Sequence, residues 1–265
     1  MSEPIDNKSF VLPSIEYDVV DHCNLNCKGC GHLSPINQPY FASVESFRND
    51  LLQLRKNNIG VERVRFLGGE PLLHPEISEF VKAAREVFSD SSVEIITNGI
   101  LLPKMDDLFW TDCNENRAQI FITKYPLNFD YNQAVALSQR HGVEISLSET
   151  NNYFKKVLNK DKKYDSRENF FLCQSMYRCA YLRDGKLFVC AGGYLLPLIN
   201  QHFQTEFPVG SSDFFDIYKD NFAVEQLIGF FNTYKEHCGW CQLPHEEGSY
   251  QWTSSNKNKD EWIID

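Results

Sequence analysis

Hydrophobic and polar positions change their spacing repeatedly between residues 14 and 150. Segments with apolar residues at every second position, typical of strands, alternate with segments that have apolar residues three and four apart, typical of helices. We expect strands at residues 14–20, 61–67, 93–97, 118–123 and 143–147, and helices at residues 43–56, 76–88 and 131–141. The helix at 76–88 is the clearest, because its apolar residues form a single stripe.

This order of elements predicts an α/β fold. Strands that alternate with helices build βα units around a parallel sheet, and about six units fit before residue 165. That number is too small to close an eight-stranded barrel, so we expect a partial (β/α)6 barrel over residues 14–165. Ligands of such sheets bind at the carboxyl ends of the strands.

The pattern changes after the charged segment 159–169, which we interpret as a boundary. Residues 181–189 predict a hairpin with an Asp184-Gly185 turn, and residues 221–233 have helical spacing. We therefore expect a small C-terminal α+β domain over residues 166–250. A tail over residues 251–265 follows, whose two tryptophans, Trp252 and Trp262, we expect to pack against the domain.

Composition and charge narrow the class of protein. The 265 residues are 42% hydrophobic and carry a net charge of −10, which argues against a nucleic-acid partner, because such binding relies on many Lys and Arg contacts to phosphates. The mean hydropathy is −0.39, and no apolar run has the length of a membrane span. The N-terminus lacks the pattern of a signal peptide. We expect a cytoplasmic protein with no membrane partner.

Nine cysteines dominate the candidate chemistry, and in a reducing compartment they favour metal ligation over disulfides. Cys23, Cys27 and Cys30 fall within the segment "DHCNLNCKGCGHLSP". Three thiolates from one loop can bind three irons of a [4Fe–4S] cluster and leave the fourth iron open. With His32 as a fourth ligand the same loop would instead bind zinc, and unligated buried thiols are the third alternative.

The C-x3-C-x2-C spacing resembles the signature of the radical S-adenosylmethionine (radical SAM) superfamily. The segment "FLGGEP" resembles the Gly-Gly-Glu motif of that family, with Gly68, Gly69 and Glu70 in the matching positions. The resemblance implies that Glu70 accepts hydrogen bonds from the methionine amino group. An ordinary turn with a solvated glutamate is the alternative.

Two further segments resemble weaker family motifs. "EIITNG" is similar to a strand end that contacts the ribose, which makes Thr97 and Asn98 candidates, unless the segment is a plain Asn-Gly turn. In "IFITKYP", Thr123 and Lys124 are candidates to face the ligand. The chain departs from the family at Gly29, where many members have an aromatic residue that packs on the adenine.

The resemblance implies two cofactors, a [4Fe–4S] cluster and S-adenosylmethionine. In the family, the fourth iron binds the amino and carboxylate groups of S-adenosylmethionine, and an electron releases a 5′-deoxyadenosyl radical that removes a hydrogen atom from the substrate. The electron would come from an external donor such as flavodoxin or ferredoxin.

The later cysteines resemble an auxiliary-cluster domain of the SPASM type, or its shortened twitch form. Eleven residues separate Cys173 from Gly185, four more precede Cys190, and the pair in "CGWC", Cys238 and Cys241, follows. Four thiolates would make a closed auxiliary [4Fe–4S] cluster or a zinc site. Cys179 is the alternative to Cys173, and we expect Cys113 to be unligated.

We therefore expect a radical SAM enzyme that acts on a small polar substrate, such as a sugar or an aminocyclitol, with net oxidation. Only about 13 residues precede the first strand, so we expect no N-terminal peptide-recognition domain. An epimerase or a peptide-modifying enzyme is the alternative, and a non-enzymatic iron–sulfur or zinc protein a distant one. Lys124, Tyr125 and Asp18 are possible bases, and Cys113 or Cys179 could donate hydrogen in an epimerase.

Overall fold

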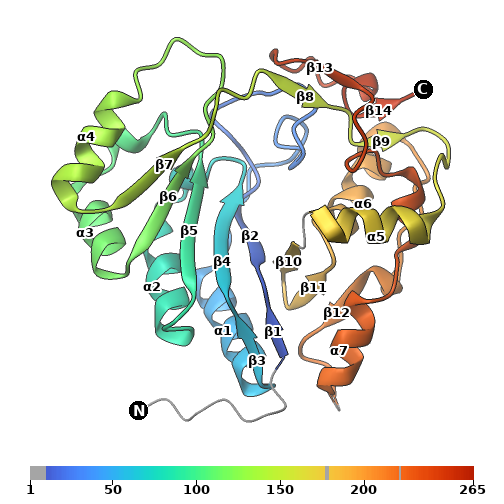
Figure 1. Ribbon diagram of the computed structural model, residues 1–265, viewed down its shortest axis with the longest axis horizontal. Helices are drawn as coiled ribbons and strands as arrows, with labels where there is room; N and C mark the ends of the chain where they lie inside the picture. Colours follow the sequence, from blue (N-terminus) through green and yellow to red (C-terminus); the bar gives the residue numbers. More distant parts are fainter. Residues whose placement is uncertain (1–9, 177–178, 221) are drawn as a thin grey trace.

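The computed structural model describes residues 10–176, 179–220 and 222–265, with an eight-stranded sheet at its centre (Figure 1). In spatial order the sheet contains β12 (Phe214–Asp216), β11 (Lys186–Phe188), β10 (Ala180–Arg183), β2 (Ile15–Val20), β4 (Arg63–Gly68), β5 (Ser92–Thr97), β6 (Ala118–Ile122) and β7 (Glu144–Leu147). All pairs from β10 to β7 are parallel. The edge strands β12 and β7 do not pair with each other, so the α/β class and the open barrel are confirmed.

The five strands that the sequence predicted before residue 165 all belong to this sheet, and their side chains alternate between its two faces. On β2, Tyr17 packs against helix residue Phe47, with 4.6 Å between ring centroids. Its neighbours Glu16 and Asp18 therefore point to the opposite face. That face has a row of polar register partners across the strands, namely Glu16, Arg65, Glu94, Gln119 and Glu144.

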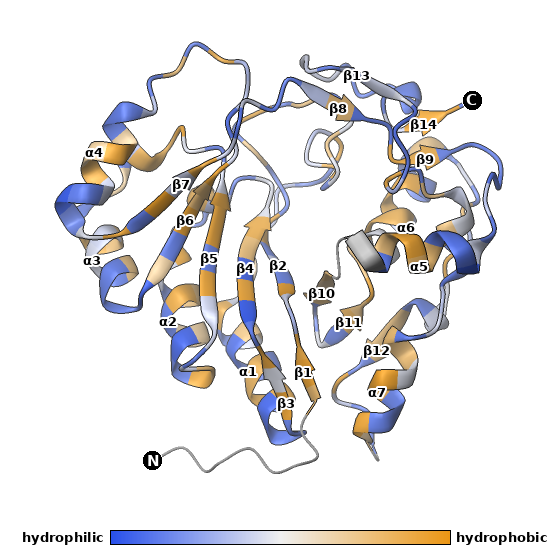
Figure 2. Ribbon diagram, viewed as in Figure 1, coloured by the Kyte–Doolittle hydropathy of each residue, from blue (hydrophilic) through white to orange (hydrophobic). Residues whose placement is uncertain are grey.

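Four helices cover the outer face of the parallel strands (Figure 1). They are α1 (Val44–Lys56), α2 (Ile77–Val87), α3 (Asp107–Glu115) and α4 (Asn132–His141). The sequence predicted all of them except α3. The main hydrophobic core lies between these helices and the sheet, and Figure 2 shows the apolar residues of β4 and β5 that contribute to it. Ser43 caps α1 by accepting a hydrogen bond from the backbone N–H of Ser46 at 3.2 Å.

The predicted hairpin is present as β10 and β11, and both turn residues have positive φ, 49° at Asp184 and 70° at Gly185. Such a turn matches the twist of the two strands. β10 also pairs in parallel with β2, with Tyr181 opposite Glu16. The sheet thus continues past residue 165. It has five strands before that residue, where we expected about six, and β10 is the sixth parallel strand.

The helices of the C-terminal third lie beside β10–β12 (Figure 1). Three helices are α5 (Ser166–Met176), α6 (Gly192–Phe203) and α7 (Val224–Phe231). The helix expected at 221–233 corresponds to α7, and residue 221 itself lies outside the described residues. Short 3-10 helices are η1 (Pro71–Leu73), η2 (Leu102–Lys104), η3 (Ser211–Asp213), η4 (Glu236–Trp240) and η5 (Lys259–Glu261).

Three two-stranded pairs complete the structure. They are β1 (Phe10–Leu12) with β3 (Ile59–Val61), β8 (Tyr153–Lys155) with β13 (Ser249–Gln251), and β9 (Leu158–Asn159) with β14 (Ile263–Ile264). The last two pairs connect the C-terminal tail to the chain that leaves β7. Among the described residues, no helix has the length and hydrophobicity needed to cross a membrane.

Candidate functional site

The three N-terminal cysteines lie in the loop that follows β2, at the carboxyl edge of the sheet. All three line a cavity of about 190 Å³, together with the motif residues Gly68, Gly69, Glu70, Thr97 and Asn98. The fold thus brings together the three cysteines, the Gly-Gly-Glu residues and the two candidate ribose contacts predicted for the first cofactor site. The cavity sits where parallel sheets generally bind their ligands.

The thiols of this loop are free and poorly solvated. Burial raises the pKa of Cys23 to about 12 and that of Cys27 to about 11. Without a cation nearby, both thiols are therefore protonated at neutral pH. A bound metal reverses that preference, because a coordinating thiol loses its proton, so the donor set fits a cationic metal group.

Gly68 and Gly69 allow the end of β4 to touch the cysteine loop. A Cβ atom at position 69 would lie 1.8 Å from the carbonyl oxygen of His22, and one at position 68 would lie 2.2 Å from that of Val20. The contact is fixed by hydrogen bonds from Gly69 N to Val20 O at 2.9 Å and from Glu70 N to His22 O at 3.0 Å. The glycines therefore allow a backbone-to-backbone approach between the end of β4 and the cysteine loop.

Glu70 is 1% exposed and accepts three hydrogen bonds. The donors are Thr97 Oγ1 at 2.5 Å, Asn98 N at 2.9 Å and Leu72 N at 3.1 Å. Burial raises the pKa of Glu70 to about 7, although these donors oppose the shift. Thr97 and Asn98 thus orient the carboxylate in this structure. Their contact with a ribose stays a prediction.

Aromatic side chains cover one side of the same cavity. Tyr125 and Phe154 both line it, and their ring centroids are 5.9 Å apart. Thr123 also lines the cavity, whereas Lys124 is not among its described lining residues. Burial raises the pKa of Tyr125 far above its usual value, so its hydroxyl is protonated at neutral pH and a poor base.

His32 lies between the first cavity and a second one, because it lines both. Its Nδ1 atom is 3.1 Å from Oδ2 of Asp18. Asp18 is 2% exposed, and its Oδ1 atom has no hydrogen-bond partner among the described residues. Of the three possible bases, Asp18 is therefore the one with a defined partner and an unsatisfied oxygen.

The second cavity, of about 300 Å³, collects the later cysteines from three separate elements. Cys173 is on α5, Cys190 follows β11, and Cys238 and Cys241 are on or beside η4. Cys179 lines the cavity as well, so the geometry leaves the choice between Cys173 and Cys179 open. The one cysteine that lines neither of these two cavities is Cys113, which is fully buried in the main core.

His237 is a residue of this second cavity that the sequence did not single out. It is 3% exposed, and its Nδ1 atom lies 3.1 Å from Oδ1 of Asp213. Burial alone would raise the pKa of the Cys190 thiol, but its hydrogen bond with His237 and the charge of His237 lower it. His237 thus contacts one of the five thiols that line this cavity. Its adjacency to Cys238 was the one available sequence signal.

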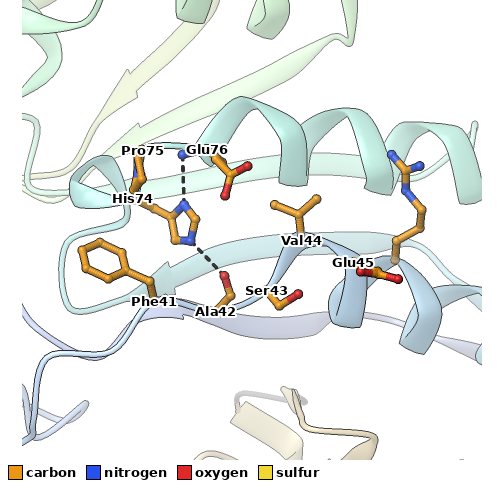
Figure 3. A pocket seen from close by; sticks show the side chains of 9 residues that line it. Phe41, Ala42, Ser43, Val44, Glu45, His74, Pro75 and Glu76 are labelled. Atoms are coloured by element: carbon orange, nitrogen blue, oxygen red, sulfur yellow. Dashed lines mark hydrogen bonds between the residues drawn. The ribbon is translucent and has the colours of Figure 1, made fainter.

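A third hollow, of about 730 Å³, is larger than the two cavities but is not lined by cysteines. It lies between the starts of α1 and α2 (Figure 3). His74 there donates from Nε2 to the carbonyl oxygen of Ala42 at 2.9 Å and accepts at Nδ1 from the N–H of Glu76 at 3.0 Å. Both ring nitrogens are thus satisfied, and the bond to Ala42 joins the two helix starts.

Among the described residues, no group of three or more His, Cys, Asp or Glu side chains is placed to hold a single metal ion.

Comparisons with known proteins support the interpretation of the first cavity as a radical SAM site. Residues 17–111 match the family model described as "Radical SAM superfamily". Several curated relatives are named "GTP 3',8-cyclase". That of Clostridium acetobutylicum is 33% identical over 104 residues, 38% of this chain and 32% of the relative. That of Helicobacter pylori is 30% identical over 147 residues, 54% of this chain and 43% of the relative. The matched part therefore spans less than half the length of either relative.

Solved structures show weaker likeness. The structure titled "Crystal structure of BtrN in complex with AdoMet and 2-DOIA" has a TM-score of 0.47 and 16% identity, covering 69% of this chain and 74% of that chain. The structure titled "Crystal structure of Streptococcus suis SuiB bound to S-adenosylmethionine" has a TM-score of 0.37 and 18% identity, covering 69% of this chain and 60% of that chain. Such similarity carries no information on activity.

The three-cysteine loop, the Gly-Gly-Glu strand end and the matched family model all concern the same part of the fold. The match also supports the [4Fe–4S] cluster and the S-adenosylmethionine that the loop implies. The chain therefore contains a radical SAM domain, in the region of residues 17–111.

Proposed function

We propose that this chain is a radical SAM enzyme that oxidises a small polar molecule with the help of an auxiliary [4Fe–4S] cluster. The observation that carries the proposal is the presence of two separate cysteine-lined cavities that share His32 as a wall. A radical SAM enzyme needs only the first cavity to generate its radical. The second is the feature that favours a further electron transfer.

Specific residues would hold each cofactor. Cys23, Cys27 and Cys30 would bind the first cluster, and Glu70 would accept hydrogen bonds from the amino group of S-adenosylmethionine. Four thiols of the second cavity, with Cys173 preferred to Cys179, would bind the auxiliary cluster. When bound, these groups supply a 5′-deoxyadenosyl radical that removes a hydrogen atom and a centre that accepts the remaining electron.

The face of the sheet opposite the helices favours the proposal of a polar substrate. Arg65 contacts Glu16 at 2.8 Å and Glu94 at 3.2 Å, and its side chain keeps 32% exposure. A charged and partly accessible row of side chains stabilises hydroxyl and amine groups better than apolar ones. Asp18 projects from the same face but lines neither cavity. Its partner His32 lies 3.1 Å away and lines both cavities, so this pair is the preferred group to take a hydroxyl proton.

The structure also bears on the alternatives. An epimerase needs a hydrogen donor beside the substrate, and Cys113 is buried in the core between the helices and the sheet. Cys179 keeps that reaction as a second candidate, because it lines the second cavity. The name shared by the curated relatives adds a purine nucleotide to the substrates worth testing, although the match covers only part of each relative.

The test is a substrate screen with the reconstituted full chain. Sugars, aminocyclitols and GTP are each added with S-adenosylmethionine and a strong reductant under anaerobic conditions, and 5′-deoxyadenosine is quantified. We expect a polar hydroxylated compound to accelerate 5′-deoxyadenosine formation and to lose two hydrogens by mass spectrometry. A product of unchanged mass would support epimerisation, and a rate increase only with GTP would support a cyclase.

A further inference from the structure

The C-terminal tail packs directly against the three-cysteine loop, a contact that no sequence motif indicated. Ser254 forms an isolated antiparallel bridge with Cys27. Lys28 N donates to Thr253 O at 2.9 Å, and Ser255 N donates to Asn26 O at 2.7 Å. The tail therefore acts as an added strand along the middle of the loop.

Two side chains, one just before the tail and one within it, extend this contact to both sides. Tyr250 donates from its hydroxyl to Lys28 O at 2.9 Å, and Trp262, fully buried, donates from Nε1 to Cys30 O at 2.8 Å. Gly29 between them has φ +59°, and a Cβ atom there would lie 1.7 Å from the Tyr250 hydroxyl. The glycine that departs from the family pattern is thus the position that the tail covers.

One tail residue reaches a sulfur atom. Trp252 donates from Nε1 to Sγ of Cys27 at 3.2 Å. Its backbone is fixed by a hydrogen bond from Trp252 N to Asn152 O at 2.8 Å, and its ring lies 6.2 Å from that of Tyr125. The indole is therefore held on both sides in a position that directs its N–H at the thiol.

We propose that Trp252 is a positioning residue that, from the C-terminal tail, donates a hydrogen bond to the Cys27 ligand and raises the reduction potential of a cluster bound there. The inference rests on the proposed role of Cys27 as a cluster ligand. Reduction adds negative charge to the cluster and its sulfurs, so an N–H donor stabilises the reduced form more than the oxidised form. Loss of the donor makes the cluster harder to reduce.

The test compares two tryptophan variants of the full chain. Trp252→Phe keeps an aromatic ring but removes the N–H that points at sulfur. Trp262→Phe removes an N–H that points at a carbonyl oxygen, and serves as the matched control. The midpoint potential is measured by a redox titration followed by electron paramagnetic resonance, using the signal that is absent in Cys27→Ala.

We expect Trp252→Phe to retain wild-type iron and to shift the midpoint to a more negative potential, with no such shift in Trp262→Phe. An unchanged midpoint in Trp252→Phe would overturn the inference. If the wild type shows no signal that depends on Cys27, the proposed function fails instead, so the two failures are distinguishable.

A second measurement needs no variant, in case Trp252→Phe does not fold. The wild-type chain is produced with tryptophan labelled at the indole nitrogen, and the reduced first cluster is examined by pulsed electron paramagnetic resonance. We expect a coupling between the labelled nitrogen and the cluster. The absence of any coupling would contradict a direct hydrogen bond from Trp252.

Discussion

A buried ion pair joins the C-terminal hairpin to the start of the three-cysteine loop, and its removal is the most informative perturbation of stability. Arg183 on β10 contacts Asp21 with Nη1–Oδ1 at 3.0 Å and Nη2–Oδ2 at 3.1 Å. It also donates to Asp18 O at 3.2 Å, and its guanidinium lies 4.3 Å from the ring centroid of Tyr40. The side chains of Arg183 and Asp21 are only 3% and 8% exposed. Burial alone would lower the pKa of Arg183, but the hydrogen bonds to Asp21 raise it.

We predict that Arg183→Met lowers the free energy of unfolding by about 3–5 kcal/mol, the cost of leaving one partner of a buried pair uncompensated. The assay is chemical denaturation of the anaerobic apo protein. Asp21→Asn in the Arg183→Met background should recover part of the loss, because it removes the unpaired carboxylate. Since Asp21 lies two residues before Cys23, we also expect Arg183→Met to bind less iron at the first site after reconstitution.

The matched control is Arg48→Met. Arg48 contacts Glu86 at 3.2 Å, but the two side chains are 40% and 62% exposed. Exposed pairs contribute less than about 1 kcal/mol, so this variant should unfold almost like the wild type. If Arg183→Met cost no more than Arg48→Met, the account of a buried clamp between the hairpin and the cysteine loop would be wrong.

Four further predictions concern the cofactor sites. Burial raises the pKa of Glu70 from 4.5 to about 7, so the fraction of ionised carboxylate increases as the pH rises through about 7. Calorimetry should therefore show that the wild type binds S-adenosylmethionine more tightly as the pH rises. The variant Glu70→Gln should show weak binding that does not depend on pH. The same pKa shift means that the folded apo protein binds the carboxyl proton of Glu70 more tightly than the unfolded chain does. The contribution of this proton to the free energy of unfolding should therefore be lost as the pH rises from about 4.5 to about 7. Glu70→Gln, which has no such proton, should not show this loss. Gly69→Ala should lower the melting temperature and the iron content, since its Cβ would meet the His22 carbonyl; normal values for both would refute that role. Iron analysis should show loss of one cluster in Cys173→Ser but not in Cys179→Ser, and the reverse result would exchange their roles.

The sequence predicted the parts of the fold that depend on local pattern. The stripe of α2 and the alternation of β2 and β4 each report burial on one face, and their positions agreed within about two residues. Helix α6 was missed because it begins with Gly192 and Gly193 and contains Pro197, all of which disfavour helices. It forms because Leu195, Leu196 and Ile199 are buried on one side, which is a tertiary effect.

The joining of β10 to β2 could not be read from the sequence either. The turn at Asp184 and Gly185 predicts that β10 pairs with β11, because hairpins are specified locally. Its pairing with β2 depends on residues far away in the chain and has no local signal. This is the physical reason why the hairpin was assigned to a separate unit although it extends the main sheet.

In the candidate site too, the sequence predicted the residues that lie close together in the chain but not the contacts between distant segments. Cysteine spacing located both sets of thiols, since closely spaced ligands of one cluster lie in one or two loops. The groups that surround the thiols come from distant segments, as Trp252 does at Cys27 and Asp213 does at His237. Such contacts form only when the whole chain has folded, so no single motif contains them.

The central claim is that the two cavities hold two iron–sulfur clusters. Its most direct test is iron and sulfide analysis of the reconstituted full chain, with Mössbauer spectroscopy, for the wild type, Cys27→Ala and Cys241→Ala. The account predicts two [4Fe–4S] clusters in the wild type and one in each variant, with 5′-deoxyadenosine formed in the wild type and lost in Cys27→Ala. Binding of zinc in place of iron, or equal iron in all three proteins, would contradict it.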